Sequence, residues 1–340
     1  MKHFAGCILI LLALLACSQE ERPASHSRLP MSWGQKQKIY VFADPHVWKM
    51  AEEPLRYTLE RPIFTTFNEK EFEIEHADIE KIEQFYKFNN VIFIGDLGSE
   101  DAVSVYLKDY LSKEVMQNVQ ETSVGMFVKH DLWARNQLAM FLLGTSKTTV
   151  TKLIQLRADA IYQPFDKMLH KRIAQQTFRQ KRYNDSAFSK YPWRMDITKN
   201  YQPYATDTAN NFISFIARLR NKPDRYLAVY YEKMPREKFT RDWLKKTRAR
   251  LAWDYYDEDE FDASSASVQN YTLGSYEGLR LKGMWQNKKY AVGGAFQTFG
   301  FYHEASQTAY VIDNSVYWPD GYKLPGLIEL EEISKTIEIN

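Results

Sequence analysis

The first half of the chain alternates short apolar runs with longer stretches of helical pattern. The runs at 38–42, 90–94 and 138–143 are rich in residues that favour strands, and the last of them is continuous and apolar, as in a buried strand. Helices are expected between these runs, at 45–57 and 102–111. This alternation of strands and helices is typical of a sheet flanked by helices.

The longest helix is predicted over 147–172. Its apolar residues keep a helical spacing and form one stripe, which consists of Val150, Ile154, Ile161, Phe165 and Met168. Pro164 lies within this stretch and is expected to kink the helix, because proline cannot donate the backbone hydrogen bond of the helical turn.

A polar, basic stretch at 175–190 separates this pattern from a second one that is richer in strands. The elements expected after it are strands at 194–197, 212–219 and 226–231, a helix at 239–253, strands near 276–285, 290–302 and 308–317, and a helix at 325–333. The fold class predicted for the whole chain is therefore α+β, with mixed or antiparallel sheets flanked by helices. We expect two domains, an N-terminal α/β domain at 37–174 and a C-terminal α+β domain at 191–340.

The first residues resemble a bacterial lipoprotein signal peptide. Lys2 and His3 give a basic start, an apolar run follows, and small residues precede Cys17. This run is too short to span a bilayer. We expect cleavage after residue 16 and acylation of Cys17, followed by a flexible tether at 17–36. The alternative is an ordinary cleaved signal in which Cys17 has no role.

The residues that follow Cys17 help to predict where in the cell the protein is located. No aspartate stands directly after this cysteine, which favours the outer membrane over retention at the inner membrane. Glu20 and Glu21 are either part of a surface-export tag or part of a solvated tether, and both interpretations stay open. The predicted location is the bacterial cell envelope, on the periplasmic or surface face of the outer membrane, with acyl chains as the membrane attachment.

Composition excludes several kinds of chemistry. The only cysteines are Cys7 and Cys17, so the processed chain offers no disulfide, thiol nucleophile or cysteine metal ligand. With 45 basic and 43 acidic residues, the chain lacks the charge excess that binding to nucleic acid requires. The histidines are not spaced as in metal-binding motifs. We therefore predict no cofactor, no metal and no nucleic-acid partner.

The candidate ligand-binding residues are Asp44, His46 and Trp48, at the point where the first strand meets the first helix. Ligands often bind at this kind of junction in α/β proteins, and the three side chains offer polar groups beside an aromatic wall. A structural role explains the same residues, because aspartate is a preferred N-cap and proline a preferred first helical residue. In that case Trp48 packs in the core.

Two other motifs are predicted to be structural. The segment 95–99 looks like a phosphate-binding loop but lacks its lysine, and Glu100 and Asp101 in the first turn of the next helix would repel a phosphate. The acidic run at 254–262 lacks the glycine and the regular oxygen spacing of a calcium loop, so we expect a solvated surface. Glycines within the strand at 290–302 suggest a bulge or a close approach of backbones, at a cleft or at a docking edge.

Several short motifs together resemble an uncharacterised bacterial lipoprotein family, classed as domain of unknown function 4837. The motifs are Phe42-Ala43-Asp44 with Trp48, Leu55-Arg56, Asn211-Phe212, Arg241-Asp242, Gly283-Met284-Trp285, Gly293-Gly294 with Phe296, and Tyr317-Trp318-Pro319. The chain departs from the family pattern at Ala295, where a proline is expected, and so resembles a divergent member. The resemblance implies an envelope location and a shared fold, and it supplies no activity.

The sequence thus favours a non-catalytic binding or assembly module in the cell envelope, with an envelope protein or a glycan as its partner. The alternative is an envelope hydrolase that acts on glycan, lipid or peptide, with Asp44 and His46 in a cleft. Ionisable groups that converge in a concave pocket favour the hydrolase. A flat apolar surface or an open sheet edge favours the binding module.

Overall fold

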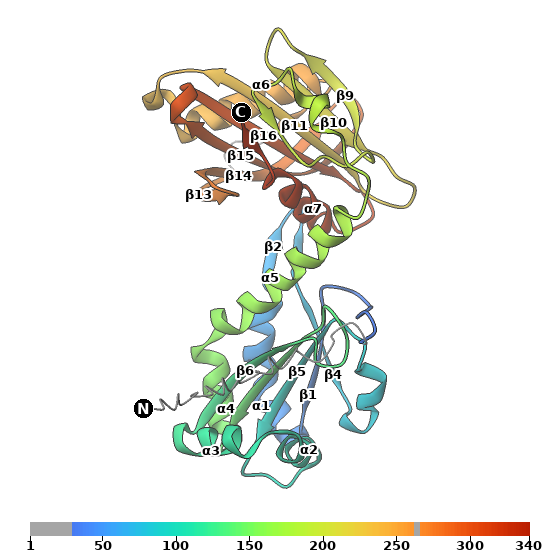
Figure 1. Ribbon diagram of the computed structural model, residues 1–340, viewed down its shortest axis with the longest axis vertical. Coiled ribbons are helices and arrows are strands. Elements are labelled where there is room, and N and C mark those ends of the chain that lie inside the picture. The colour runs from blue at the N-terminus through green and yellow to red at the C-terminus, as the bar shows by residue number, and fades with distance from the viewer. Residues whose placement is uncertain (1–28, 262–265) are drawn as a thin grey trace, which may run out of the picture.

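The computed structural model describes residues 29–261 and 266–340. Within these residues the strands form two large sheets, one of five and one of eight strands, and each sheet is flanked by helices (Figure 1). The predicted α+β class is therefore confirmed. Cys17 and the predicted signal peptide lie outside the described residues.

The five-stranded sheet belongs to the N-terminal half and is mixed. Its first four strands in spatial order run parallel, and the last strand pairs antiparallel with its neighbour. In that order the strands are β4 (Glu73–Ala77), β1 (Lys38–Ala43), β5 (Asn90–Asp96), β7 (Leu138–Gly144) and β6 (Val124–His130). The strands β5 and β7 are buried along their whole length, as the apolar runs in the sequence predicted.

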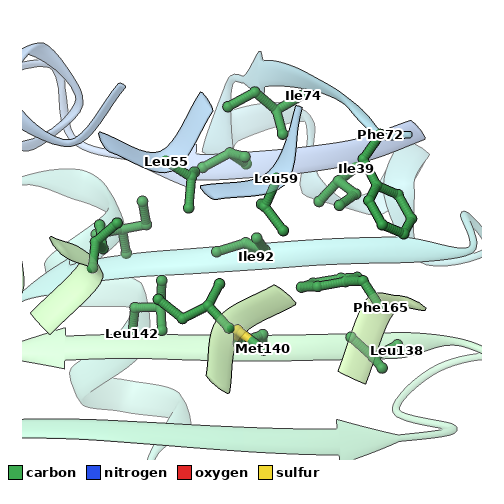
Figure 2. Packing of buried hydrophobic residues seen from close by; sticks show 14 of the residues in the cluster. Ile39, Leu55, Leu59, Phe72, Ile74, Ile92, Leu138, Met140, Leu142 and Phe165 are labelled. Atoms are coloured by element: carbon green, nitrogen blue, oxygen red, sulfur yellow. The ribbon is translucent and has the colours of Figure 1, made fainter. Parts of the chain in front are cut away.

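Helices cover both faces of this sheet because its strands carry apolar residues on both sides. One face packs against α1 (Pro45–Leu59), α4 (Lys147–Leu156) and α5 (Ala158–Thr177). The other packs against α2 (Ala102–Tyr110), α3 (Lys113–Thr122) and the 3-10 helix η2 (Ile79–Phe85). Figure 2 shows the first of these two cores, in which Leu55 and Leu59 of α1 lie over Ile92 of β5.

The eight-stranded sheet belongs to the C-terminal half and is antiparallel throughout. In spatial order its strands are β12 (Glu260–Phe261), β14 (Tyr276–Asn287), β15 (Val292–His303), β16 (Thr308–Tyr317), β11 (Asp224–Lys233), β10 (Phe212–Ala217) and β9 (Gln202–Asp207), with β13 (Ser267–Leu273) also on β14. Helix α6 (Arg241–Tyr255) packs on one face and α7 (Leu324–Ser334) on the other. The short elements are η3 (Asp185–Phe188), β8 (Trp193–Arg194), η4 (Arg236–Lys238), η5 (Glu304–Ser306) and β17 (Glu338–Ile339).

The two halves meet through α5, α7 and a hairpin made of β2 (Pro62–Phe64) and β3 (Asn68–Lys70), as Figure 1 shows. Glu69 of this hairpin is 1% exposed, and its carboxylate accepts the backbone N–H groups of Lys323 at 2.8 Å and Leu324 at 2.9 Å. These N–H groups lie at the start of α7, where the helix itself offers them no partner. A side chain of the N-terminal half therefore caps a helix of the C-terminal half.

The prediction of one helix over 147–172 is wrong, because the chain forms two. The break lies at Arg157, whose φ of −117° and ψ of 27° depart from helical values, and Pro164 lies inside α5. No helix in residues 29–261 and 266–340 is long and apolar enough to cross a membrane.

Candidate functional site

Asp44 stands at the N-cap position of α1, but its side chain makes no bond to that helix. The carboxylate instead accepts the backbone N–H of Val103 at 2.8 Å, and the N–H and hydroxyl of Ser104 at 3.1 and 2.7 Å. Only 2% of Asp44 is exposed. The side chain therefore caps α2, and the expectation that it caps its own helix is wrong.

His46 and Trp48 have other neighbours. The Nδ1 atom of His46 lies 2.9 Å from the carboxylate of Asp101, which stands at the N-cap position of α2. The Trp48 ring stacks on His76, with ring centroids 4.6 Å apart and 3° between the planes. The structure thus directs Asp44, His46 and Trp48 to three different partners.

The segment 95–101 is held by its own hydrogen bonds. The Asp96 carboxylate accepts the backbone N–H of Gly98 at 2.9 Å and that of Lys147 at 2.8 Å. Glu100 and Asp101 precede α2, which begins at Ala102, so their predicted place in its first turn is wrong. The negative charge at the start of this helix is supplied by Asp44 from a distant part of the chain.

The richest set of ionisable side chains lies in a cleft of 560 Å³ where the two halves meet, which we call the central cleft. It is bounded by α5, α7, the hairpin strand β2 and the strands β13 to β15. The charged and phenolic residues that line it are Glu71, Tyr162, Asp166, Lys167, His170, Lys171, Tyr271, Arg280, Lys282, Glu331, Glu332 and Lys335.

One wall of the central cleft holds a closed network of ion pairs. His170 of α5 contacts Glu332 of α7 at 2.6 Å, and the Lys335 ammonium lies 2.6 Å from Glu332 and 3.0 Å from Glu331. Burial disfavours the charged His170 ring, but the bond to Glu332 and the negative charges of Glu331 and Glu332 together outweigh burial and raise the pKa of His170. Burial likewise opposes the charge on Glu331 and Glu332, yet Lys335 and His170 hold the pKa of each below its ordinary value.

This network has the residue types of a metal site, since His170, Glu331 and Glu332 bring ligand atoms within 4.8 Å of one another. The Lys335 ammonium already contacts both carboxylates, however, and occupies the place that a cation would take. The hydroxyl of Tyr271 also donates to Glu331, at 2.5 Å. The carboxylates are thus neutralised by the protein itself.

Lys282 lies on β14 in the same cleft and differs from the other cations there. It is half-buried, and within residues 29–261 and 266–340 its ammonium makes no hydrogen bond or ion pair. Burial, with a contribution from the nearby Arg280 charge, lowers the pKa of Lys282 to about 8. Arg280 itself lies 3.7 Å from Glu331 and stacks on the Tyr271 ring.

Glu71 faces the cleft from the N-terminal half. The hydroxyl of Tyr162 donates to its carboxylate, and the Arg61 guanidinium lies over the Tyr162 ring at 3.8 Å from the centroid. Burial raises the pKa of Glu71 despite this hydrogen bond. Glu71 and Lys282 are therefore both shifted towards their neutral forms, which is common at functional sites.

The sequence did not point to the central cleft. Its charged and phenolic residues come from five separate segments. The visible local pattern is the spacing of three and four residues that pairs charges on a helix, as in Asp166 with His170 and in Glu331 and Glu332 with Lys335. Among the described residues that line the cleft, none is a serine, threonine or cysteine. The arrangement is suited to holding an acidic group against Lys282.

The glycines in β15 have a packing role. This strand lies between β14 and β16, so it is not a sheet edge, and a Cβ atom on Gly294 would stand 2.1 Å from the Val316 carbonyl oxygen. The predicted close approach of backbones is confirmed. Six residues of the motifs that resemble the family line one hollow of 360 Å³ here: Met284, Trp285, Gly293, Gly294, Trp318 and Pro319.

Solved structures show only distant similarity. A Bacteroides thetaiotaomicron protein is 13% identical at a TM-score of 0.29, and the match covers 44% of this chain and 45% of that protein, less than half its length. The Saccharomyces cerevisiae Ran-binding protein Mog1p is 9% identical at a TM-score of 0.32, and the match covers 44% of this chain and 90% of that protein. Mycobacterium tuberculosis LpqN, described as involved in cell envelope biogenesis, is 10% identical at a TM-score of 0.28. That match covers 44% of this chain and 83% of LpqN. Similarity at this level says nothing about what the present chain binds.

No curated protein matches the chain. Two family models do, and they divide it near the end of α5. Residues 32–178 match domain of unknown function DUF8532, and this match contains the motifs around Asp44, Trp48 and Leu55. Residues 180–336 match domain of unknown function DUF4837. The C-terminal part of the chain thus carries a divergent DUF4837 domain, which confirms the resemblance seen in its motifs.

Proposed function

We propose that the protein is a lipid-anchored protein of the bacterial cell envelope that binds a ligand bearing an acidic group in the central cleft, without converting it chemically. The observation that carries the proposal is Lys282, a half-buried cation without a partner among the described residues. Arg280, Lys335 and His170, the other partly buried basic groups of the cleft, each lie beside a carboxylate, and Lys167 and Lys171 are exposed.

The energetics favour an acidic ligand. A charged ammonium that is partly removed from water is unfavourable unless an opposite charge or hydrogen bonds compensate it. A carboxylate or phosphate beside Lys282 supplies that compensation. The cleft volume of 560 Å³ lies within the range of small-molecule sites, which is about 300–1,000 Å³.

Glucuronate and glucose make a matched pair of probes, because they share a sugar ring and differ in the carboxylate. We expect glucuronate to bind in calorimetric titrations and glucose not to bind. Lys282→Met should weaken glucuronate binding about tenfold or more, since a hydrogen bond to a charged group contributes about 1.5–3 kcal/mol. Lys152→Met, on the exposed side of α4, is the control. Equal binding of the two sugars would contradict the proposal.

Hydrolysis is the second candidate. Glu71 with a raised pKa and Lys282 with a lowered one face the same cleft, and groups shifted in this way serve as acid and base in enzymes. Prolonged incubation with p-nitrophenyl glucuronide should release no p-nitrophenol if the cleft only binds. Release by the wild type that is lost in Glu71→Gln would favour the enzyme.

The lipid anchor is tested separately, through the two cysteines. The motif before Cys17 supports acylation of that residue, whereas Cys7 lies within the segment expected to be removed. In cells that are fed labelled palmitate, we expect label in the wild type and in Cys7→Ala, and none in Cys17→Ala. Processed wild-type protein without label would favour an ordinary cleaved signal.

A further inference from the structure

Two large apolar side chains are exposed at the start of the described chain, just before β1. Met31 and Trp33 belong to an extended segment that forms isolated bridges to Arg135 and Phe88. Because side chains two residues apart in an extended segment point to the same side, the two form one apolar stripe. Met31 is 39% exposed and Trp33 is 58% exposed. Tryptophan is mostly buried in folded proteins, so a packing role alone does not account for this exposure.

The stripe is exposed, yet its place in the fold is fixed. The Trp33 ring packs on Phe88 with ring centroids 4.8 Å apart, and the Trp33 N–H donates to the carbonyl of Lys87 at 2.8 Å. The N–H of Arg135 donates to the carbonyl of Pro30, also at 2.8 Å. These bonds place two basic residues, Lys87 and Arg135, directly beside the stripe.

Further cations surround the stripe. The Lys87 and Arg135 side chains are exposed, and within residues 29–261 and 266–340 neither forms an ion pair or a hydrogen bond. Lys36 follows the stripe and donates to the neutral Gln176 side chain at 2.6 Å, and it lines one cleft together with Lys222. We call the stripe and these cations the basic face, which consists of Met31, Trp33, Lys36, Lys87, Arg135 and Lys222.

The charge of the basic face is only partly balanced by the protein. Arg172, which is buried behind it, bonds to neutral carbonyl and amide oxygens of three asparagines at 2.7 to 2.9 Å. Burial, together with the positive charges of Arg172 and Lys222, lowers the pKa of Lys36. The neighbouring acidic residues are Asp131, which accepts a backbone N–H at 2.6 Å, and Glu73, which lines the same cleft as Lys36. Positive charge thus exceeds negative charge here, although the whole chain has a net charge of only +2.

The basic face lies close to the point where the expected lipid tether joins the described chain. Leu29 follows Cys17 by twelve positions, and a chain of that length spans about 40 Å at most. An acylated Cys17 would therefore keep the basic face within reach of the membrane surface. Tethering also raises the local concentration of the face at that surface, so that a weak attraction is sufficient for docking.

We propose that the basic face docks on the anionic phospholipid surface of the membrane that holds the acyl anchor, with the Trp33 ring at the level of the lipid headgroups. Tryptophan favours this interfacial layer, and anionic lipids attract lysine and arginine that lie near the surface. An anionic bilayer thus offers an apolar layer and negative charge together. The proposal rests on the lipid anchor proposed above, and it adds a second contact that fixes how the protein lies on the membrane.

A fluorescent label on the processed, acylated protein in vesicles tests the docking. Gln35→Cys places a thiol at an exposed position beside Trp33. Tyr57→Cys places one on α1, which covers the opposite face of the five-stranded sheet from η2. Each protein is labelled with nitrobenzoxadiazole in vesicles of equal parts phosphatidylcholine and phosphatidylglycerol that contain a lipid with a spin-labelled headgroup as quencher. We expect at least about twofold quenching at position 35 and little at position 57.

Two sets of variants separate the apolar and the charged contributions. Trp33→Ser removes the interfacial ring, and Lys87→Gln with Arg135→Gln removes two cations. Each set should reduce the quenching at position 35 about twofold or more. Lys152→Gln with Arg157→Gln, at two exposed cations outside the basic face, is the matched control and should leave the quenching unchanged. Vesicles of phosphatidylcholine alone, or high salt, should weaken the quenching as well.

Three results would overturn the docking: equal quenching at positions 35 and 57, quenching at position 35 that neither set of variants reduces, and quenching that is as strong on phosphatidylcholine alone. Failure of the lipid anchor gives a different result. The acylated wild type has no free thiol and takes up no label, whereas a wild type that is not acylated keeps the Cys17 thiol and is labelled.

Discussion

Two regions of the molecule gather charged side chains, and they differ in how far those charges are paired. Around Asp44, at the start of α2, each buried polar group has a partner: the Asp44 carboxylate accepts three hydrogen bonds and that of Asp96 accepts two. In the central cleft, Lys282 has none among the described residues. A half-buried charged group that has no protein partner and a shifted pKa is a candidate functional group.

Glu69 extends the comparison, because it repeats the arrangement of Asp44 at the junction of the two halves. Both are buried carboxylates that accept backbone N–H groups at the start of a helix distant in sequence. Sequence inspection notes an aspartate or a glutamate at these places but cannot show which helix it will cap. Both carboxylates position other elements, and their oxygens have few acceptor positions left for a ligand.

The largest effect is expected from Asp44→Ala. The substitution leaves the N–H groups of Val103 and Ser104 buried without a partner, and should lower the free energy of unfolding by about 3–4 kcal/mol. Urea unfolding measures the change. Asp44→Asn, which keeps one acceptor oxygen, should lose less. Glucuronate affinity should be unchanged in the folded protein, and a loss of it would link this region to the ligand.

Glu69→Ala should lower the free energy of unfolding by about 2–3 kcal/mol, because α7 loses the cap that the N-terminal half provides. Glu69→Gln keeps one acceptor and is the matched control. Since α7 carries Glu331 and Glu332, glucuronate affinity should fall as well. Unfolding of the alanine variant at wild-type urea concentrations would show that this contact does not hold the halves together.

Lys282→Met should stabilise the protein, in contrast to the two substitutions above, and raise the free energy of unfolding at pH 7 by about 1–2 kcal/mol. A half-buried charge is replaced by an apolar side chain of similar length, which removes the cost of desolvation. The same variant should lose glucuronate binding. A Lys282→Met protein that is less stable than the wild type would indicate that this ammonium has a partner in the free protein.

The pH dependence of stability follows from the same residue. Its pKa is lowered to about 8 in the folded state from an ordinary value of 10.5, so between these values the unfolded chain binds the proton and the folded chain does not. The destabilisation by Lys282 is therefore complete below about pH 8 and disappears as the pH rises to about 10.5. The difference in free energy of unfolding between the wild type and Lys282→Met should therefore decrease to zero as the pH rises from about 8 to about 10.5.

The smallest effect is expected from His46→Ala. His46 pairs with Asp101 at 2.9 Å, but their side chains are 33% and 54% exposed, so the pair should contribute less than about 1 kcal/mol. Urea unfolding and glucuronate titration should both give near wild-type values. A tenfold loss of glucuronate affinity would indicate that the ligand binds at Asp44, His46 and Trp48, the candidate site predicted from the sequence.

Local patterns in the sequence predicted the elements but not the site. The apolar runs of β5 and β7 and the helical stripe of α1 identified their own secondary structure. The hairpin β2–β3 and the strand β13 were missed because they are short or largely exposed and carry no apolar alternation. Lys282 and His170 line the same cleft only because the two halves pack together, which no local pattern encodes.

The most direct test of the account is a pH titration of the Lys282 side chain, followed by the NMR signal of its ε-carbon with and without glucuronate. We expect the free protein to give a pKa near 8, and bound glucuronate to raise that pKa because its carboxylate stabilises the charged ammonium. A pKa near 10.5 in the free protein, or one that glucuronate does not move, would contradict the assignment of Lys282 as the anion-binding residue of the central cleft.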